Sequence, residues 1–162
     1  MPTRHAGPAH EVRALNCFIK LMRAADTVSA RLGRTLTVHG LTMGQLGVLE
    51  ALLHAGPMCQ RDLGRKLLRS GANVTTVVDN LERVGLVKRE RGAPDRRLMT
   101  VSLTGAGRTL IGRVFPDHVA SIAAVFGALA PAEQEELARL CKKLGLAAAA
   151  PSADSEPLER TG

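Results

Sequence analysis

The chain has 162 residues, enough for one domain with its own hydrophobic core, and it carries a formal net charge of +7. It contains no Trp, no Tyr and three Phe, which excludes the aromatic stacking platforms of single-strand binders, so its basic charge favours duplex DNA among polyanions. Its three cysteines are an odd number without CxxC spacing, which argues against a disulfide framework and for a reducing compartment.

The predicted elements begin after a short N-terminal segment. Residues 1–10 contain Pro, Gly and His, and we expect them to be disordered. They lack the apolar core of a signal peptide, and no apolar run approaches the roughly 20 residues of a membrane span, so a cytoplasmic location is expected. From Glu11 to Leu32 apolar residues recur at helical spacing, and this long stripe is expected to pack against a second subunit. Residues 33–40 are predicted to be a linker.

Two shorter helices are predicted next. Thr42 and Gln45 have the spacing of a capping box, and the helix that they begin is expected to end at Gly56. Its inward-facing residues are predicted to be Leu46, Leu49, Leu52 and Leu53. Residues 58–68 are predicted to form the second helix, with Leu63 and Leu67 as its core contacts.

The stretch from Ser70 to Thr104 is the most informative part of the chain. Ser70 can cap a helix that Gly85 would end, and the apolar residues between them follow one helix face. These apolar residues are Val74, Val77, Val78 and Leu81. Two strands are predicted next, at Leu86–Arg91 and Met99–Leu103, joined by a Gly-Ala-Pro-Asp turn. A helix followed directly by a basic hairpin is typical of the recognition helix and wing of a winged helix-turn-helix domain.

Two longer helices complete the predicted fold. Thr104 is positioned to cap a helix that runs to about Leu129, and a last helix with an apolar stripe is predicted over Ala132–Leu146. Residues 147–162 are rich in Ala, Ser and Pro and are expected to be a disordered tail. The sequence therefore predicts a mainly α fold over residues 11–146, a winged helix-turn-helix with a two-stranded β wing and a helical dimerisation region.

The predicted hairpin and the helix before it carry a motif. Asp95-Arg96-Arg97 is followed after five residues by Leu103-Thr104, the pattern DxRx₅LT, and it comes after the helix sequence NVTTVVDNLE. With this combination the chain resembles the MarR family of bacterial transcription regulators over residues 15–144. The resemblance implies a homodimer that binds a pseudo-palindromic operator in duplex DNA, acts as a repressor, and responds to a small phenolic or oxidant signal.

The candidate DNA-binding residues form two groups, the first on the recognition helix. Ser70, Asn73, Thr75 and Thr76 occupy its first turns, where such helices reach base edges. Asn can form two hydrogen bonds with adenine, and Thr can contact the thymine methyl group. The alternative interpretation is an ordinary solvated polar face.

The wing supplies the second group. The resemblance implies that Arg97 enters the minor groove and that Asp95 holds it in place through a charge-assisted hydrogen bond. The other basic side chains of the hairpin are expected to contact phosphates, which position the protein without reading sequence. They are Lys88, Arg89, Arg91 and Arg96. A solvated hairpin is the alternative for the whole cluster.

Cysteine chemistry offers an alternative signal. Cys17, which precedes Phe18, occupies a position similar to that of the sensing cysteine in the organic-hydroperoxide branch of the family. That branch uses tyrosine hydroxyls to activate and hold the thiol, and this chain has no Tyr. Cys59 begins a predicted helix, where the helix N-terminus can lower a thiol pKa. An oxidant sensor that uses either cysteine is therefore an alternative to control by a non-covalent ligand, for which Met22 and His118 are candidate pocket residues.

Other classes of function are weakly supported. The five histidines have no metal-ligand spacing with one another or with cysteine, so no metal site is predicted. The chain has no phosphate-binding glycine loop, nucleophile elbow or pair of catalytic acids, so the sequence predicts neither an enzyme nor a cofactor. A dimeric interaction adaptor that has lost DNA binding is a further alternative, and the basic hairpin argues against it.

Overall fold

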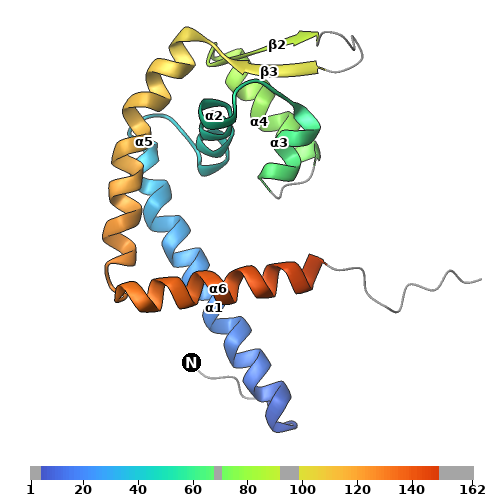
Figure 1. Ribbon diagram of the computed structural model, residues 1–162, viewed down its shortest axis with the longest axis vertical. Coiled ribbons are helices and arrows are strands. Elements are labelled where there is room, and N and C mark those ends of the chain that lie inside the picture. The colour runs from blue at the N-terminus through green and yellow to red at the C-terminus, as the bar shows by residue number, and fades with distance from the viewer. Residues whose placement is uncertain (1–4, 68–70, 92–98, 150–162) are drawn as a thin grey trace, which may run out of the picture. The chain divides into compact units, whose positions relative to one another are not determined.

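The computed structural model describes residues 5–67, 71–91 and 99–149, and it confirms a mainly α fold with a small antiparallel sheet (Figure 1). In chain order the elements are α1 (Ala9–Thr37), α2 (Met43–Ala55), β1 (Met58–Cys59), α3 (Gln60–Lys66), α4 (Gly71–Arg83), β2 (Val87–Arg91), β3 (Met99–Leu103), α5 (Gly105–Phe126) and α6 (Pro131–Ala149). The chain divides into two compact units, residues 1–122 and 123–162, which are described separately.

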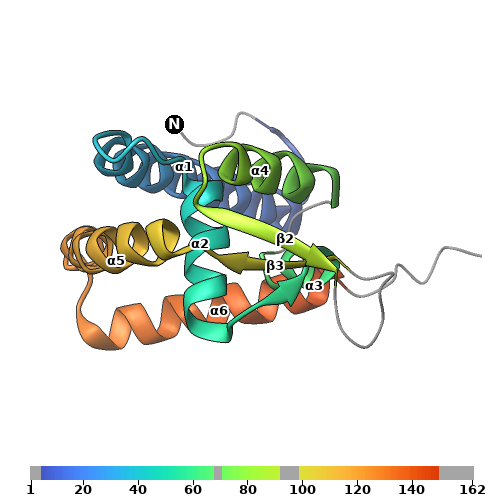
Figure 2. The same cartoon turned by 90° about the horizontal axis from the view of Figure 1, so that it is seen from above.

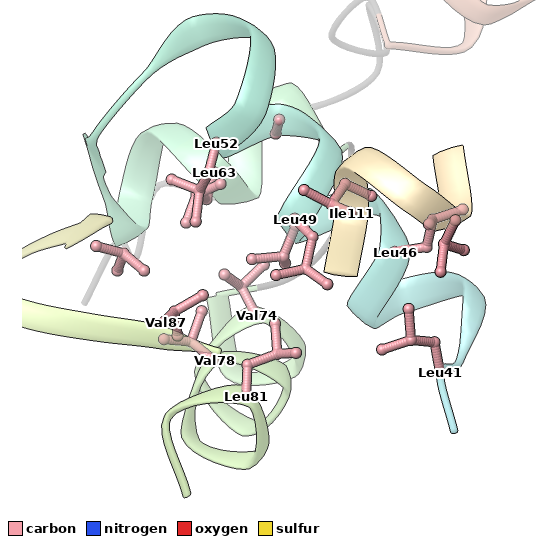
Figure 3. Close-up of a cluster of buried hydrophobic side chains, with 14 of the residues drawn as sticks. Leu41, Leu46, Leu49, Leu52, Leu63, Val74, Val78, Leu81, Val87 and Ile111 are labelled. Carbon is pink, nitrogen blue, oxygen red and sulfur yellow. The ribbon is translucent and has the colours of Figure 1, made fainter. Parts of the chain in front are cut away.

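The hydrophobic core of the first unit is built around α2. The predicted capping box is confirmed, because the Thr42 hydroxyl accepts from the Gln45 backbone N–H at 3.2 Å and the Gln45 side chain accepts from the Thr42 N–H at 2.9 Å. Leu49 near the middle of α2 is fully buried, and side chains from the neighbouring helices and strands surround it (Figure 3). They include Leu46, Leu52, Leu63, Val74, Val78, Leu81, Val87, Val101 and Ile111.

Helix α1 does not stop where the sequence predicts. It continues through Gly33 to Thr37, so the prediction of a linker over residues 33–40 is wrong for residues 33–37. A glycine inside a helix costs only about 1 kcal/mol relative to alanine. The buried Leu36 side chain offsets this cost, since full burial of a leucine contributes about 1.5–3 kcal/mol. The helix instead ends before Gly40, whose φ of 67° suits glycine.

The sheet has three strands rather than the predicted two. Strand β3 lies between β1 and β2, and both pairs are antiparallel (Figure 2). The predicted pairing of the two hairpin strands is confirmed, with Val87 opposite Leu103 and Arg91 opposite Met99, while the predicted Gly-Ala-Pro-Asp turn lies outside the described residues. Helices α2, α3 and α4 lie on one side of the sheet (Figure 1).

The third strand corrects the prediction of a helix over residues 58–68. Met58 and Cys59 are extended as β1, and Met58 lies opposite Val101 of β3. Gly56, at a φ of 76°, ends α2, and the edge of β3 then offers hydrogen-bond partners to the next two residues. Helix α3 begins only at Gln60, because this strand pairing is a tertiary contact that the local sequence pattern does not contain.

The base of the hairpin is fixed where α4, β2 and α5 meet. Helix α4 ends as predicted at Gly85, whose φ is 72°, and the Leu86 N–H donates to the Leu81 carbonyl at 2.9 Å. The Thr104 hydroxyl donates to the Gly85 carbonyl at 2.7 Å and accepts from the Gly107 N–H at 3.0 Å, which confirms it as the cap of α5. Gly107 is required because a Cβ there would collide with the Leu86 carbonyl.

Helix α5 is long and apolar enough to cross a membrane by length and composition alone, with a mean hydropathy of 1.2. Its apolar side chains have another partner, because Ile111 and Val114 are buried in the core of the first unit. Polar residues, among them Arg108, Arg113 and Asp117, share the same segment. We therefore assign α5 to the protein core.

The second unit contains the end of α5 and helix α6. The Gln134 side-chain amide donates to the carbonyls of Phe126 and Leu129, both at 3.1 Å, which joins α6 to the turn before it. No residue of α6 is buried. This helix extends three residues past its predicted end and α1 begins two residues before its predicted start; residues 1–4 and 150–162 lie outside the described residues.

Candidate nucleic-acid interface

Helix α4 has one buried apolar face and one exposed polar face. Val74 and Val78 are fully buried and point into the core (Figure 3). The predicted reading residues Asn73, Thr75 and Thr76 are all exposed. The period of the helix accounts for both faces, since residues three and four apart share one side. The fourth predicted residue of this group, Ser70, lies outside the described residues.

A polar network joins this helix to the two elements beside it. The side-chain amide of Gln60, the first residue of α3, donates to the Thr75 hydroxyl at 2.7 Å. The same amide accepts at its oxygen from Arg89 Nε at 3.2 Å. Helices α3 and α4 and strand β2 are therefore connected through one glutamine. Sequence reasoning missed Gln60, because its role depends on two partners that are distant along the chain.

Arg89, one of the predicted phosphate contacts, forms its polar contacts within the chain. Its side chain is only 16 % exposed, and its guanidinium forms ion pairs with Asp79 and with Glu82, the latter at 2.6 Å. Burial lowers the pKa of Arg89, but hydrogen bonds and charge from these two carboxylates outweigh it and raise the pKa above its usual value. The predicted phosphate contact of Arg89 would therefore require its guanidinium to leave these two carboxylates.

Two of the other predicted basic residues lie on the exposed hairpin surface. Lys88 and Arg91 of β2 are both exposed. Lys88 Nζ pairs with Glu90 at 2.8 Å, and such a surface pair contributes only about 0–1 kcal/mol, so a phosphate could replace the carboxylate. The predicted wing-tip residues Asp95, Arg96 and Arg97 lie outside the described residues.

The cysteines occupy three different settings. Cys17 in α1 and Cys141 in α6 are exposed. Cys59 immediately precedes α3, and its thiol donates to the Asp62 carboxylate at 2.9 Å. This hydrogen bond is the main cause that lowers the pKa of Asp62, with a further contribution from Arg65. The Cys59 thiol therefore serves as a hydrogen-bond donor in this structure.

The two predicted pocket residues differ in burial. His118 is buried and faces a cavity of about 20 Å³ between α1 and α5, close to the size of one water molecule. Its Nδ1 has no hydrogen-bond partner among the described residues. Burial lowers the pKa of His118, while the nearby Glu50 charge partly opposes this. Met22 is exposed on α1, about 20 Å along the helix from the cavity-lining Thr35.

A larger hollow lies between α2 and α3 in the first unit. Its volume is about 330 Å³, and Glu50, His54 and Lys66 supply its ionisable groups. The His54 ring contacts Phe115 of α5 edge to face, with 5.1 Å between the ring centroids. Across the described residues, no group of three or more His, Cys, Asp and Glu side chains is arranged to hold a metal ion.

Comparisons with known proteins agree with this geometry. The family model described as MarR family matches residues 39–98, from the end of α1 to the wing. The HTH-type transcriptional regulator YkoM of Bacillus subtilis is 37% identical over 134 residues, which cover 83% of this chain and 87% of YkoM.

Two solved structures are also similar. Sco3205, a MarR family transcriptional regulator from Streptomyces coelicolor solved in complex with DNA, has a TM-score of 0.80 and 23% identity, covering 93% of this chain and 96% of that chain. Bordetella bronchiseptica BpsR, whose DNA binding is regulated by 6-hydroxynicotinic acid, has a TM-score of 0.73 and 29% identity, covering 80% of this chain and 98% of that chain.

Proposed function

The chain belongs to the MarR family of winged helix-turn-helix transcription regulators, and from this premise we propose that it is a repressor that binds a pseudo-palindromic operator as a homodimer. A small-molecule effector would release it from DNA. It would act in the cytoplasm, through binding rather than catalysis.

The observation that carries the proposal is the division of α4 into two faces. Its apolar face fixes the helix on the core, and Asn73, Thr75 and Thr76 stand on the exposed face, beside the hairpin that carries Lys88 and Arg91. Side chains of these types can bond base edges in the major groove, while the basic residues bind phosphates. This combination supports duplex DNA as the partner.

The wing tip completes the proposed interface. The DxR motif places Asp95 two residues before Arg97, and we propose that Arg97 enters the minor groove while Asp95 orients it. Arg96 would contact phosphate, and Ser70 would contribute at the start of α4. This part of the proposal rests on the motif, because these residues lie outside the described ones.

Exposed apolar side chains support the proposed homodimer. On α1, Phe18 is 59 % exposed and Met22 is 43 % exposed; on α6, Leu140 is 47 % exposed and Leu144 is 53 % exposed. An apolar stripe along a helix is stable in water only when something covers it. We propose a second copy of the chain as the cover, because two winged lobes would then match two half-sites of a pseudo-palindrome.

The hollow between α2 and α3 supports control by a small molecule. Its volume of about 330 Å³ lies at the lower end of the range for ligand sites. Glu50, His54 and Lys66 in its lining suit a phenol, whose hydroxyl can both donate and accept a hydrogen bond. The exposed Cys17 keeps an oxidant-sensing mechanism as the second candidate. Treatment with an organic peroxide separates the two, because only a thiol sensor would release DNA in wild type and retain it in Cys17→Ser or, if Cys59 is the sensor, in Cys59→Ser.

Fluorescence anisotropy with promoter DNA flanking the chain's own gene tests DNA binding. With Lys88, Arg91 and Arg96 contributing from each subunit, six phosphate contacts would lower the affinity by about 10³-fold between about 50 and 200 mM salt, because bound cations replace condensed counterions. A duplex of the same composition in scrambled order is the control. Equal affinity for both duplexes, or affinity that does not change with salt, would contradict the proposal.

A further inference from the structure

We infer that Arg89 is a positioning residue, which holds the recognition helix α4 at a fixed angle to β2 and α3 and does not itself contact DNA. The inference deepens the proposed function and rests on it. It distinguishes Arg89 from Lys88 and Arg91 on the same strand, although the sequence presents all three as equivalent basic residues.

The guanidinium of Arg89 is surrounded by acceptors from two helices. Nε donates to Gln60 of α3 at 3.2 Å, Nη1 donates to Glu82 of α4 at 2.6 Å, and Nη2 donates to Asp79 of α4. The Arg89 backbone N–H also donates to the second carboxylate oxygen of Glu82, at 2.9 Å. Arginine suits such a site because its planar group presents five donors in a fixed fork.

The network reaches the exposed face of α4 by two routes. Gln60 bridges Arg89 and the Thr75 hydroxyl, and Asp79 lies one helical turn after Thr75. Because Glu82 lies near the C-terminal end of α4 and Thr75 near its start, the contacts are distributed along the helix. Rotation of α4 against the hairpin would therefore have to break several hydrogen bonds at once.

Contact between Arg89 and a DNA phosphate would require Arg89 to lose its present partners. The side chain would have to leave Gln60, Asp79 and Glu82, and two carboxylates on the DNA-facing helix would then lose their cation. A phosphate gained by one arginine would be offset by two acidic groups facing a polyanion. Lys88 has no such obstacle, because its one ion pair lies on the exposed hairpin surface.

Removing the charge of Asp79 gives opposite expectations for the two roles. If Arg89 positions α4, Asp79→Asn loosens the helix and lowers affinity for the promoter duplex by about tenfold, the scale of one lost specific contact. Affinity for the scrambled duplex should not fall, because phosphate contacts remain. If Arg89 binds phosphate, Asp79→Asn frees it and removes a negative charge, so both duplexes are bound more tightly.

Glu90→Gln is the matched control, since it removes the same charge from the Lys88 pair on the same hairpin. It should leave promoter affinity unchanged or raise it slightly. Affinities are measured by anisotropy at one salt concentration, and circular dichroism with thermal unfolding checks the fold. Asp79→Asn that binds the promoter duplex as tightly as wild type or more tightly, or that weakens both duplexes equally, overturns the inference.

Arg89→Lys is the second variant, and it tests the same inference if Asp79→Asn does not fold. Lysine keeps the charge but cannot span three acceptors, so promoter affinity should fall by about tenfold while the dependence of log affinity on log salt stays unchanged. Lys88→Gln should instead lower that slope by about one per site. Wild-type affinity in Arg89→Lys overturns the inference, whereas a wild type that does not prefer the promoter duplex contradicts the proposed function itself.

Discussion

Two regions of the molecule differ in how they bury their apolar side chains. One is the winged lobe, which comprises α2, α3, α4 and the three-stranded sheet, and the other is helix α6. In the lobe, Leu49, Leu63 and Val78 are fully buried by other parts of the same chain. In α6, Leu137, Leu140 and Leu144 are 38 to 53 % exposed, and no residue of the helix is buried. The lobe thus completes its core within one polypeptide, whereas α6 presents an apolar stripe that no described residue of the second unit buries.

This difference predicts two kinds of stability in one chain. The loss of stability caused by a substitution in the core of the lobe should not depend on protein concentration, because the contacts that it removes are internal. The proposed dimer through α1 and α6 should instead stabilise the folded chain more as the protein concentration rises, because a partner binds the folded state by mass action. Substitutions in the two regions should therefore be distinguished by their concentration dependence.

The largest effect is expected from a charge placed in the α6 stripe. A symmetric dimer contains Leu140 twice, so Leu140→Lys removes two buried leucine side chains from the interface. The loss of each one costs about 1.5–3 kcal/mol of dimer stability. The dimer dissociation constant should therefore rise by at least about 100-fold, since 1.4 kcal/mol corresponds to a factor of ten. Sedimentation velocity over a range of protein concentrations measures this change.

Two variants sharpen the contrast with the lobe. Lys142→Gln changes an exposed polar residue of the same helix and should leave the dimer intact. Leu49→Ala creates a cavity in the core and should lower the free energy of unfolding by about 2–5 kcal/mol at every protein concentration. A Leu140→Lys protein that remains dimeric at low concentration would show that α6 is not part of the dimer interface.

Much of this arrangement could be predicted from local sequence signals. The capping box at Thr42, the left-handed Gly85 and the Thr104 cap each depend on residues only a few positions apart, and all three are confirmed. The apolar spacing of α4 correctly identified Val74 and Val78 as its buried residues. Such features are encoded within one or two helical turns.

The corrected predictions depend on tertiary contacts. Met58 becomes a strand residue because Val101, distant along the chain, offers it a sheet edge. Helix α1 continues past Gly33 because Leu36 is buried by other elements. The hydrogen bonds of Arg89 to its three partners on α3 and α4 could not be predicted either, because these partners are distant along the chain. No local period or spacing contains this information.

A smaller effect, on how the folding stability depends on pH, is expected from His118, a buried polar side chain in the first unit. Burial lowers its pKa below the ordinary value of 6.5. Above that value the imidazole is neutral in both folded and unfolded chains, so the stability associated with neutral His118 is fully present. As the pH falls from 6.5 through the folded pKa, the unfolded chain binds the proton more readily and this stability is lost.

Urea unfolding at pH 7.5 and pH 5, at one protein concentration, measures this dependence. The loss of stability on acidification should be smaller in His118→Gln than in wild type, while His10→Gln, at an exposed position, should match wild type. Helix α6 has no buried titratable group and should contribute no comparable change. An identical loss in His118→Gln and wild type would show that His118 is not the group responsible.

In the proposed homodimer, two winged lobes joined through α1 and α6 read one pseudo-palindromic site. Selection of bound sequences from a pool of random duplexes tests it most directly, because no operator has to be assumed. We predict that the enriched sequences form an inverted repeat with half-site centres about one helical turn apart, roughly 10–10.5 base pairs. Enrichment of a single unrepeated half-site, or of no sequence at all, would contradict the account.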